Sequence, residues 1–207
     1  MISFDTKILV TGSSGMIGSS LIRIFRAKGY KNLLTPDSEE LNLFDIGQTE
    51  KYFRDNCPQV IIIASGKTGG IKFNSDNPFK LINENLTMQN NIFHSLKYIQ
   101  KFEKLIYIAS SCVYPNHHNQ AMNEELILSG SPEPSNISYA ISKIAGIVSC
   151  MSFNKQFKNK KCIALIPASC YGPHDNFDLE NSHVLSGIMK KMINSKKINK
   201  DLVTLWG

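Results

Sequence analysis

The sequence lacks any apolar stretch that approaches the length of a membrane span, so a transmembrane protein is not indicated. Its first residues, MISFDTKILVTG, contain Asp5 and Lys7 and only a short apolar run, and they do not resemble a secretory signal peptide. The five cysteines are odd in number and include no C-x-x-C spacing, which argues against a disulfide framework and against a zinc site. We therefore expect a cytoplasmic protein with no bound metal.

An arginine-rich run and a ladder of stacking aromatics are also missing, although the formal net charge is +6. Much of the excess positive charge lies in the last third of the chain, where lysines are frequent. A solvated lysine-rich face explains this excess better than a nucleic-acid site does. A mildly positive surface serves an anionic small-molecule substrate equally well. We expect neither a nucleic-acid partner nor a membrane partner.

Apolar strand patterns alternate with helical patterns along the 207 residues, which suffice for one well-buried domain. Continuous apolar strands separated by helices favour a parallel sheet covered on both faces, and right-handed crossovers then give a doubly wound α/β fold. The irregular stretch 111–138 is long for a compact domain, and such loops are usually functional. Strands are predicted at 7–11, 32–35, 59–64, 104–110 and 161–167, and helices at 16–28, 46–56, 79–100 and 139–157.

A glycine-rich turn, VTGSSGMIG, joins the first predicted strand to the first predicted helix. Gly12 permits a tight turn, Gly15 lets the backbone approach a pyrophosphate, and Gly18 lets the helix pack closely on the strand. The N-terminus of the helix supplies N–H groups and partial positive charge for phosphates. Three glycines also occur in ordinary loops, and it is their place at the first strand–helix junction that predicts dinucleotide binding.

The segment YAISK places Tyr139 and Lys143 four residues apart at the start of a helix, hence on one face. A lysine ammonium beside a phenol lowers the phenol pKa toward neutrality, so that the tyrosine can pass a proton to a carbonyl oxygen. The spacing is common by chance, and an ordinary helix surface is the alternative. Ser110 ends the fourth strand at the sheet edge where open α/β folds bind ligands, and its hydroxyl can hold the same oxygen.

Five segments, SSCVYP, YAISKIAG, YGPHDNF, NSHVL and LVTLWG, resemble the GDP-L-fucose synthase family of the extended short-chain dehydrogenase/reductase superfamily. The resemblance implies a Rossmann-type domain, NADPH as cofactor, and epimerisation at C3 and C5 with reduction at C4 of GDP-4-keto-6-deoxy-mannose. It makes Cys112 the base and His183 the acid for the epimerisation, with Tyr139 protonating the C4 oxygen. Without the resemblance, Cys112 would be interpreted as a packing residue and His183 as a surface residue.

The same resemblance implies the remaining site residues. Cofactor contacts are expected from Gly12, Ser14, Gly15, Met16, Ile17, Gly18, Asn42, Leu43, Ala64, Tyr139, Lys143 and Pro167. Substrate contacts are expected from Ser110, Ser111, Cys112, His183, Lys191 and Trp206. A GDP-sugar substrate and a homodimer follow from it as well.

Several positions depart from the family pattern. Ser14 and the segment TPDSEE stand where some members carry arginines for the 2′-phosphate, and we expect no lysine nearby, so NADH is possible. Lys191 replaces a family arginine and loses its bidentate fork. The family continues beyond LVTLWG, so we expect a Rossmann domain at 1–180 and only the beginning of a truncated substrate lobe at 181–207. Another nucleotide-sugar epimerase/reductase, or a cofactor-binding module without activity, are the alternatives.

Overall fold

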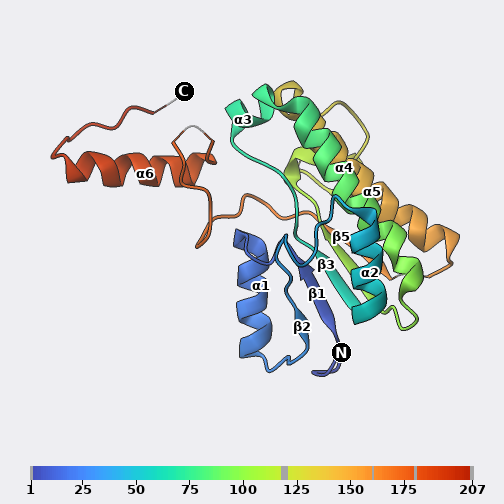
Figure 1. Cartoon of the computed structure of the whole chain (residues 1–207). Helices are drawn as coiled ribbons and strands as arrows, with labels where there is room; N and C mark the ends of the chain where they lie inside the picture. The colour runs from blue at the N-terminus through green and yellow to red at the C-terminus, as the bar shows by residue number, and fades with distance from the viewer. Residues whose placement is uncertain (1, 118–120, 160, 180, 206–207) are drawn as a thin grey trace.

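A computed structural model describes residues 2–117, 121–159, 161–179 and 181–205 (Figure 1). Strands and helices alternate along most of the chain. The strands are β1 (Ile8–Thr11), β2 (Leu33–Leu34), β3 (Val60–Ile63), β4 (Lys104–Ile108) and β5 (Cys162–Leu165). The α-helices are α1 (Met16–Ala27), α2 (Ile46–Asn56), α3 (Ile71–Asp76), α4 (Pro78–Ser95), α5 (Ile137–Gln156) and α6 (Val184–Lys197). Short 3₁₀ turns are η1 (Leu96–Tyr98), η2 (Ser111–Val113), η3 (Glu124–Leu126) and η4 (Pro134–Asn136).

The five strands form one parallel sheet in the order β2-β1-β3-β4-β5. This confirms the predicted doubly wound α/β fold. After β1 the chain moves outward to β2 and then returns to the other side of β1 as β3, so the order reverses between β1 and β3. A reversal of this kind leaves a crevice at the carboxyl ends of the two strands, and ligands bind there in open α/β sheets.

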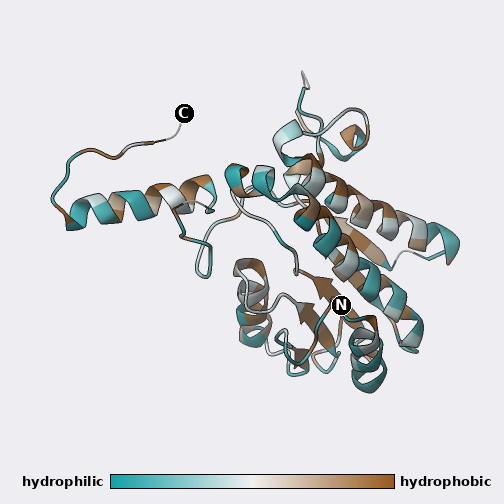
Figure 2. Ribbon diagram, turned by 45° about the horizontal axis from the view of Figure 1, so that its top comes forward, coloured by the Kyte–Doolittle hydropathy of each residue, from teal (hydrophilic) through white to brown (hydrophobic). Residues whose placement is uncertain are grey.

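The two faces of the sheet are covered unequally. Alternate strand residues on one face pack with α2, α4 and α5 in the larger hydrophobic core, and those on the other face pack with α1 in a smaller one. The strands are accordingly hydrophobic along their length in Figure 2. On the α1 face, Ile163 and Leu165 of the edge strand β5 remain 43% and 48% exposed.

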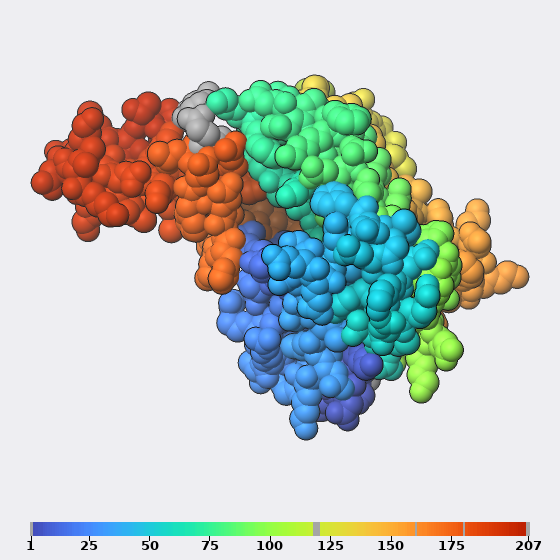
Figure 3. Space-filling view, viewed as in Figure 1, coloured from blue at the N-terminus to red at the C-terminus, as the bar shows by residue number. Residues whose placement is uncertain are grey.

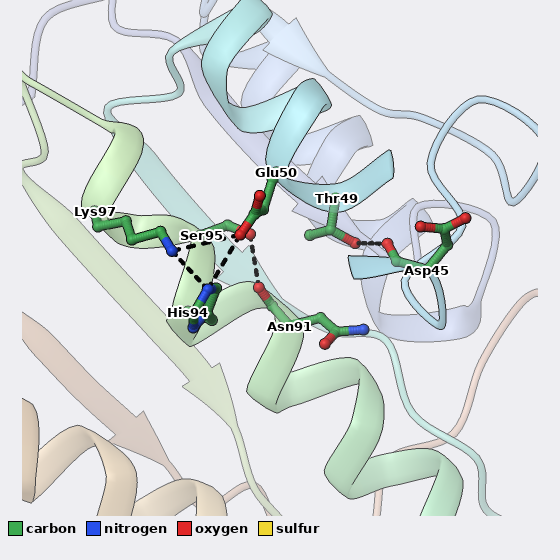
Figure 4. A network of polar contacts seen from close by, with 7 residues as sticks. All are labelled: Asp45, Thr49, Glu50, Asn91, His94, Ser95 and Lys97. Carbon is green, nitrogen blue, oxygen red and sulfur yellow. Dashed lines mark hydrogen bonds and ion pairs between the residues drawn. The ribbon is translucent and has the colours of Figure 1, made fainter. Parts of the chain in front are cut away.

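A polar network fixes α2 against the end of α4 (Figure 4). The Glu50 carboxylate in α2 lies 3.1 Å from Nε2 of His94 and 3.4 Å from Nζ of Lys97. The same lysine and the Arg54 guanidinium lie over the Tyr98 ring. These contacts hold α2 at the side of the sheet, away from the carboxyl ends of the strands.

Two helices were not among the predicted elements. The six-residue α3 is too short to show a periodic pattern and follows directly on Gly69 and Gly70. The longer α6 projects to one side of the body of the molecule (Figure 3) and exposes apolar residues along much of its length. The described parts of 111–136 are irregular as predicted and contain 3₁₀ turns, and α5 begins at Ile137. None of the helices in the described residues is long and apolar enough to cross a membrane.

Tyr107 lies at the centre of the larger core and fixes how closely α5 approaches the sheet. It is 1% exposed, and its hydroxyl donates to Oε1 of Gln89 at 2.8 Å. A Cβ atom at Gly146 of α5 would lie 2.2 Å from Cζ of this ring. Only glycine therefore lets the helix that carries Tyr139 and Lys143 pack against the strand that leads to Ser110.

We expect Gly146→Ala to lower the free energy of unfolding by about 1–3 kcal/mol, because the added methyl group overpacks a core that lacks space for it. Urea denaturation followed by circular dichroism measures the change. Gly47→Ala in α2 is the matched control, since its Cβ would meet only the Asp45 carboxylate, at 3.3 Å. Equal stability of the two variants would contradict this account of the packing.

Candidate active site

The glycine turn after β1 has the close backbone contacts that its sequence predicts. Gly12 has φ +68°, and a Cβ atom there would lie 2.7 Å from the backbone nitrogen of Ser65. A Cβ atom at Gly18 would lie 2.1 Å from the Gly12 carbonyl oxygen. The first turn of α1 is therefore held directly on the strand end, with its N–H groups at the crevice, as dinucleotide binding requires.

One pocket of about 400 Å³ lies at the point where the strand order reverses. Its walls come from the ends of β1, β2 and β3. Among the residues predicted to contact the cofactor, it is lined by Gly12, Ser14, Gly15, Asn42, Leu43 and Ala64. The shape and position suit the adenosine end of a dinucleotide.

The polar groups at the β2 side of this pocket are mainly acidic or neutral. Oδ1 of Asp37 accepts hydrogen bonds from the backbone N–H groups of Glu39 and Glu40, both at 2.9 Å. An acidic residue after β2 suits the ribose hydroxyls better than a 2′-phosphate. Of the described residues that line the pocket, Lys67 alone carries a positive charge. The prediction that no lysine lies nearby is wrong, because the loop after β3 returns to this pocket with Lys67.

A second pocket, of about 800 Å³, brings together side chains that are far apart in the sequence. Ser110 follows β4, Tyr139 is in α5, and His183 is the N-cap residue of α6; all three line it. Four further predicted residues share its wall, namely Met16, Ile17, Ser111 and Pro167. The pocket thus runs from the N-terminus of α1 to the start of α6.

The remaining predicted substrate residues lie elsewhere. Lys191 lines an adjacent pocket of about 250 Å³, which shares His183 with the larger one, and its Nζ donates to the Thr204 carbonyl at 3.0 Å. Trp206 lies outside the described residues. No group of three or more His, Cys, Asp or Glu side chains within the described ranges is arranged to hold a metal ion.

Cys112 lies beside Ser110 but does not line the large pocket. The Ser110 hydroxyl accepts from the backbone N–H of Cys112 at 3.5 Å and begins the η2 turn. Burial raises the pKa of the Cys112 thiol, while a hydrogen bond with Ser110 and the charge of Lys143 act in the opposite direction. The thiol is therefore protonated at neutral pH in this structure, next to two groups that favour its ionised form.

The ionisation of Tyr139 differs from the prediction. Burial raises the pKa of its phenol to about 12, with a further increase from Cys112, and hydrogen bonds from Thr68 and Ser110 only partly offset these effects. Lys143 points instead to the carbonyl of Ile108, to which its Nζ donates at 3.0 Å. The prediction that Lys143 brings this pKa toward neutrality is wrong for this structure. A protonated phenol is nevertheless the form that can donate a proton.

Lys143 is itself almost completely buried, with 6% of its surface exposed. Burial lowers its pKa from 10.5 to about 8, although the neighbouring Cys112 favours the charged form. Its Nζ also lies 5.1 Å from the centre of the Tyr107 ring. Lys143 lines neither pocket and lies beneath the site, where its charge acts on the groups above it.

The loop between β3 and α3, residues 64–70, contributes to the site and was not predicted beyond Ala64. Lys67 lines the first pocket, and Thr68 and Gly69 line the second. Two buried asparagines, Asn74 and Asn85, hydrogen-bond to its backbone. One feature of the sequence could have indicated this loop. The glycine-rich segment GKTGG follows a buried strand, at the edge of the sheet where ligands bind.

The comparisons with known proteins show which family the chain is similar to. The profile of the "NAD dependent epimerase/dehydratase family" matches residues 8–207. A putative GDP-L-fucose synthase 2 from Arabidopsis thaliana is 38% identical over 207 residues, which are 100% of this chain and 62% of that protein. A GDP-L-colitose synthase from Yersinia pseudotuberculosis is 34% identical over 201 residues, 97% of this chain and 65% of that protein.

Among solved structures, a GDP-L-fucose synthetase from Naegleria fowleri bound to NADP superposes with a TM-score of 0.88 at 28% identity. The match covers 99% of this chain and 67% of that one. The chain thus spans 62% of the length of the Arabidopsis relative and 65% of the length of the Yersinia relative.

The buried Lys143 predicts a pH dependence of stability. Between pH 8 and 10.5 the unfolded chain holds a proton at this lysine that the folded protein has released, so its contribution to the free energy of unfolding rises with pH. The full contribution corresponds to about 3 kcal/mol. Lys143→Met should remove this rise, whereas Lys155→Met, an exposed position on the same helix, should keep it.

Urea denaturation of the three proteins at half-unit pH steps tests the expectation. Parallel stability curves for Lys143→Met and the wild type between pH 8 and 10.5 would show that the lysine is not held in a strongly desolvated environment.

Proposed function

The chain belongs to the NAD dependent epimerase/dehydratase family, and we propose that it acts as an NADPH-dependent enzyme that converts GDP-4-keto-6-deoxy-mannose to GDP-L-fucose. The reaction inverts C3 and C5 and reduces the C4 ketone. The observation that carries the proposal is the convergence of Ser110, Tyr139 and His183 on one pocket that begins at the N-terminus of α1. The names of the Arabidopsis and Naegleria relatives support the substrate and the cofactor.

The cofactor fits the residues at the crevice. The N–H groups of the first turn of α1 would hold its phosphates, and the pocket lined by Asn42 and Leu43 would hold its adenosine end. Pro167, Met16 and Ile17 would border its nicotinamide end. When bound, NADPH supplies the hydride for C4. Because Asp37 rather than an arginine lies after β2, we propose that NADH is also accepted.

The epimerisation requires a proton to leave and return on opposite faces of the sugar at C3 and at C5. The C4 ketone makes these protons acidic, and the Ser110 hydroxyl would hold the ketone oxygen as negative charge develops there. Cys112 would accept the proton at Sγ, with Lys143 and Ser110 favouring the thiolate that this role needs. The exposed imidazole of His183 would return a proton from the other face.

The reduction requires a proton at the C4 oxygen. Tyr139 is protonated in this structure and is 9% exposed, so its phenol can deliver that proton with little competition from water. Thr68 and Ser110, which lower the pKa of this phenol, would stabilise the phenolate that remains. The order of steps follows from the chemistry, since reduction removes the ketone on which both epimerisations depend.

A second candidate is the same chemistry on a different GDP-sugar. The Yersinia relative, named for GDP-L-colitose, matches nearly as well as the relatives named for GDP-L-fucose. Ser169 and Lys191 lie at the pockets where sugar and nucleotide would be recognised, and Lys191 departs from the family pattern. Product analysis with each keto sugar decides between the two. If the protein binds the cofactor but converts neither keto sugar, the result would favour the remaining alternative, a cofactor-binding module without activity.

The wider assignments are proposals that accompany this function. We propose residues 1–180 as the cofactor-binding domain and 181–207 as part of the substrate lobe. Exposed apolar residues on α5, including Ile141, Val148 and Met151, suit the contact surface of a homodimer. All five cysteines are free, in keeping with a reducing cytoplasmic location.

The test separates the two half-reactions. The protein is incubated with the keto sugar in D₂O, first with NADP⁺ to follow deuterium exchange at C3 and C5 by NMR, then with NADPH to follow reduction. Tyr139→Phe should lower reduction at least about a hundredfold and retain exchange. Cys112→Ser should lose exchange and bind NADPH as the wild type does.

Cys57→Ser, at an exposed position after α2, is the matched control and should change neither step. Exchange at the wild-type rate in folded Cys112→Ser would make Cys112 a packing residue. Unchanged turnover in Tyr139→Phe would remove the phenol from the mechanism.

A further inference from the structure

We propose that Thr68 is a positioning residue of this site, whose hydroxyl holds the Tyr139 phenol in the direction of the substrate carbonyl oxygen. The inference rests on the proposed function. It adds a third hydroxyl to the predicted pair of Ser110 and Tyr139, from a loop that the sequence analysis did not include in the site.

The first observation is the meeting of three hydroxyl side chains at one wall. Thr68, Ser110 and Tyr139 all line the 800 Å³ pocket. The side chains of Thr68 and Ser110 both act on the Tyr139 phenol and lower its pKa, against the effect of burial. The phenol, the loop after β3 and the end of β4 therefore meet at one wall of this pocket.

The second observation is that the backbone on both sides of Thr68 is fixed by buried amides. Asn85 accepts from the N–H of Lys67 at 2.8 Å and donates to its carbonyl at 2.9 Å. Asn74 accepts from the N–H of Gly69 at 3.0 Å. Both asparagines are at most 5% exposed. Moving Thr68 would leave a buried polar group unpaired, which is unfavourable.

The third observation connects this loop to the helix that carries the phenol. Nδ2 of Asn74 donates to Oδ1 of Asn136 at 2.8 Å. Asn136 is the N-cap residue of α5, and Tyr139 lies in the first turn of that helix. One buried amide therefore bonds both to the backbone next to Thr68 and to the start of the Tyr139 helix, and it helps to set the distance between the two hydroxyls.

The chemistry gives the hydroxyl a defined role. Thr68 is exposed and buries little surface, so its replacement by the isosteric valine removes a hydrogen bond and little packing. A donor to the phenol oxygen stabilises the phenolate and opposes the increase in pKa that burial causes. Without the Thr68 hydroxyl, the Tyr139 phenol becomes a weaker acid and its orientation toward the substrate is less well defined.

The experiment compares Thr68→Val with Thr68→Ser, which restores a hydroxyl, and with Thr87→Val, which removes a threonine hydroxyl that bonds only within α4. The first readout is the ¹³Cζ resonance of Tyr139 in tyrosine-labelled protein, assigned with Tyr139→Phe. The second is the pH profile of kcat and KM for reduction of the keto sugar.

Thr68→Val should shift the Tyr139 resonance, lower kcat about tenfold with KM nearly unchanged, and move the pH profile. Thr68→Ser and Thr87→Val should resemble the wild type in both readouts. An unshifted Tyr139 resonance in Thr68→Val, or equal losses in Thr68→Ser and Thr68→Val, would overturn the proposal. A wild type that reduces no keto sugar would contradict the proposed function instead, and the resonance would still decide the placement of Thr68.

Discussion

The side-chain amide of Asn74 is the contact on which the arrangement of the site depends. It accepts from Gly69 in the loop after β3 and donates to Asn136 at the start of α5, and it is 5% exposed. The loop and the helix start are therefore held as one body, although they come from separate parts of the chain.

As a consequence, the short loop at 64–70 borders both the pocket proposed for the cofactor and the pocket proposed for the substrate. Lys67 faces the pocket proposed for the adenosine end, and Thr68 faces the pocket that contains the phenol. Gly70 donates its N–H to the Asn181 carbonyl at 2.9 Å, and a Cβ atom there would lie 2.4 Å from the Ser182 carbonyl oxygen. The segment that leads to His183 is thus packed on the same loop. Cofactor, phenol and substrate segment are positioned by a common element rather than independently.

The sequence predicts the sheet because its strands are continuous apolar runs, and it predicts where Ser110 and Tyr139 meet because parallel strands end at one edge. It does not predict the ionisation of Tyr139, since the burial that raises its pKa and the turn of Lys143 toward Ile108 arise only from packing. The sequence also does not predict the contribution of Thr68. That contribution depends on the Asn74–Asn136 hydrogen bond, which joins residues 62 positions apart and leaves no periodic pattern.

Hydrogen exchange with mass spectrometry on Asn74→Leu tests the central role of this amide most directly. Asn77→Leu is the control, because its side chain donates only to the neighbouring Phe73 carbonyl. The account predicts that Asn74→Leu exchanges faster both in the loop at 64–70 and at the start of α5, while β1, β3 and β4 stay protected and the control changes neither segment. Faster exchange in only one of the two segments, or in neither, would contradict it.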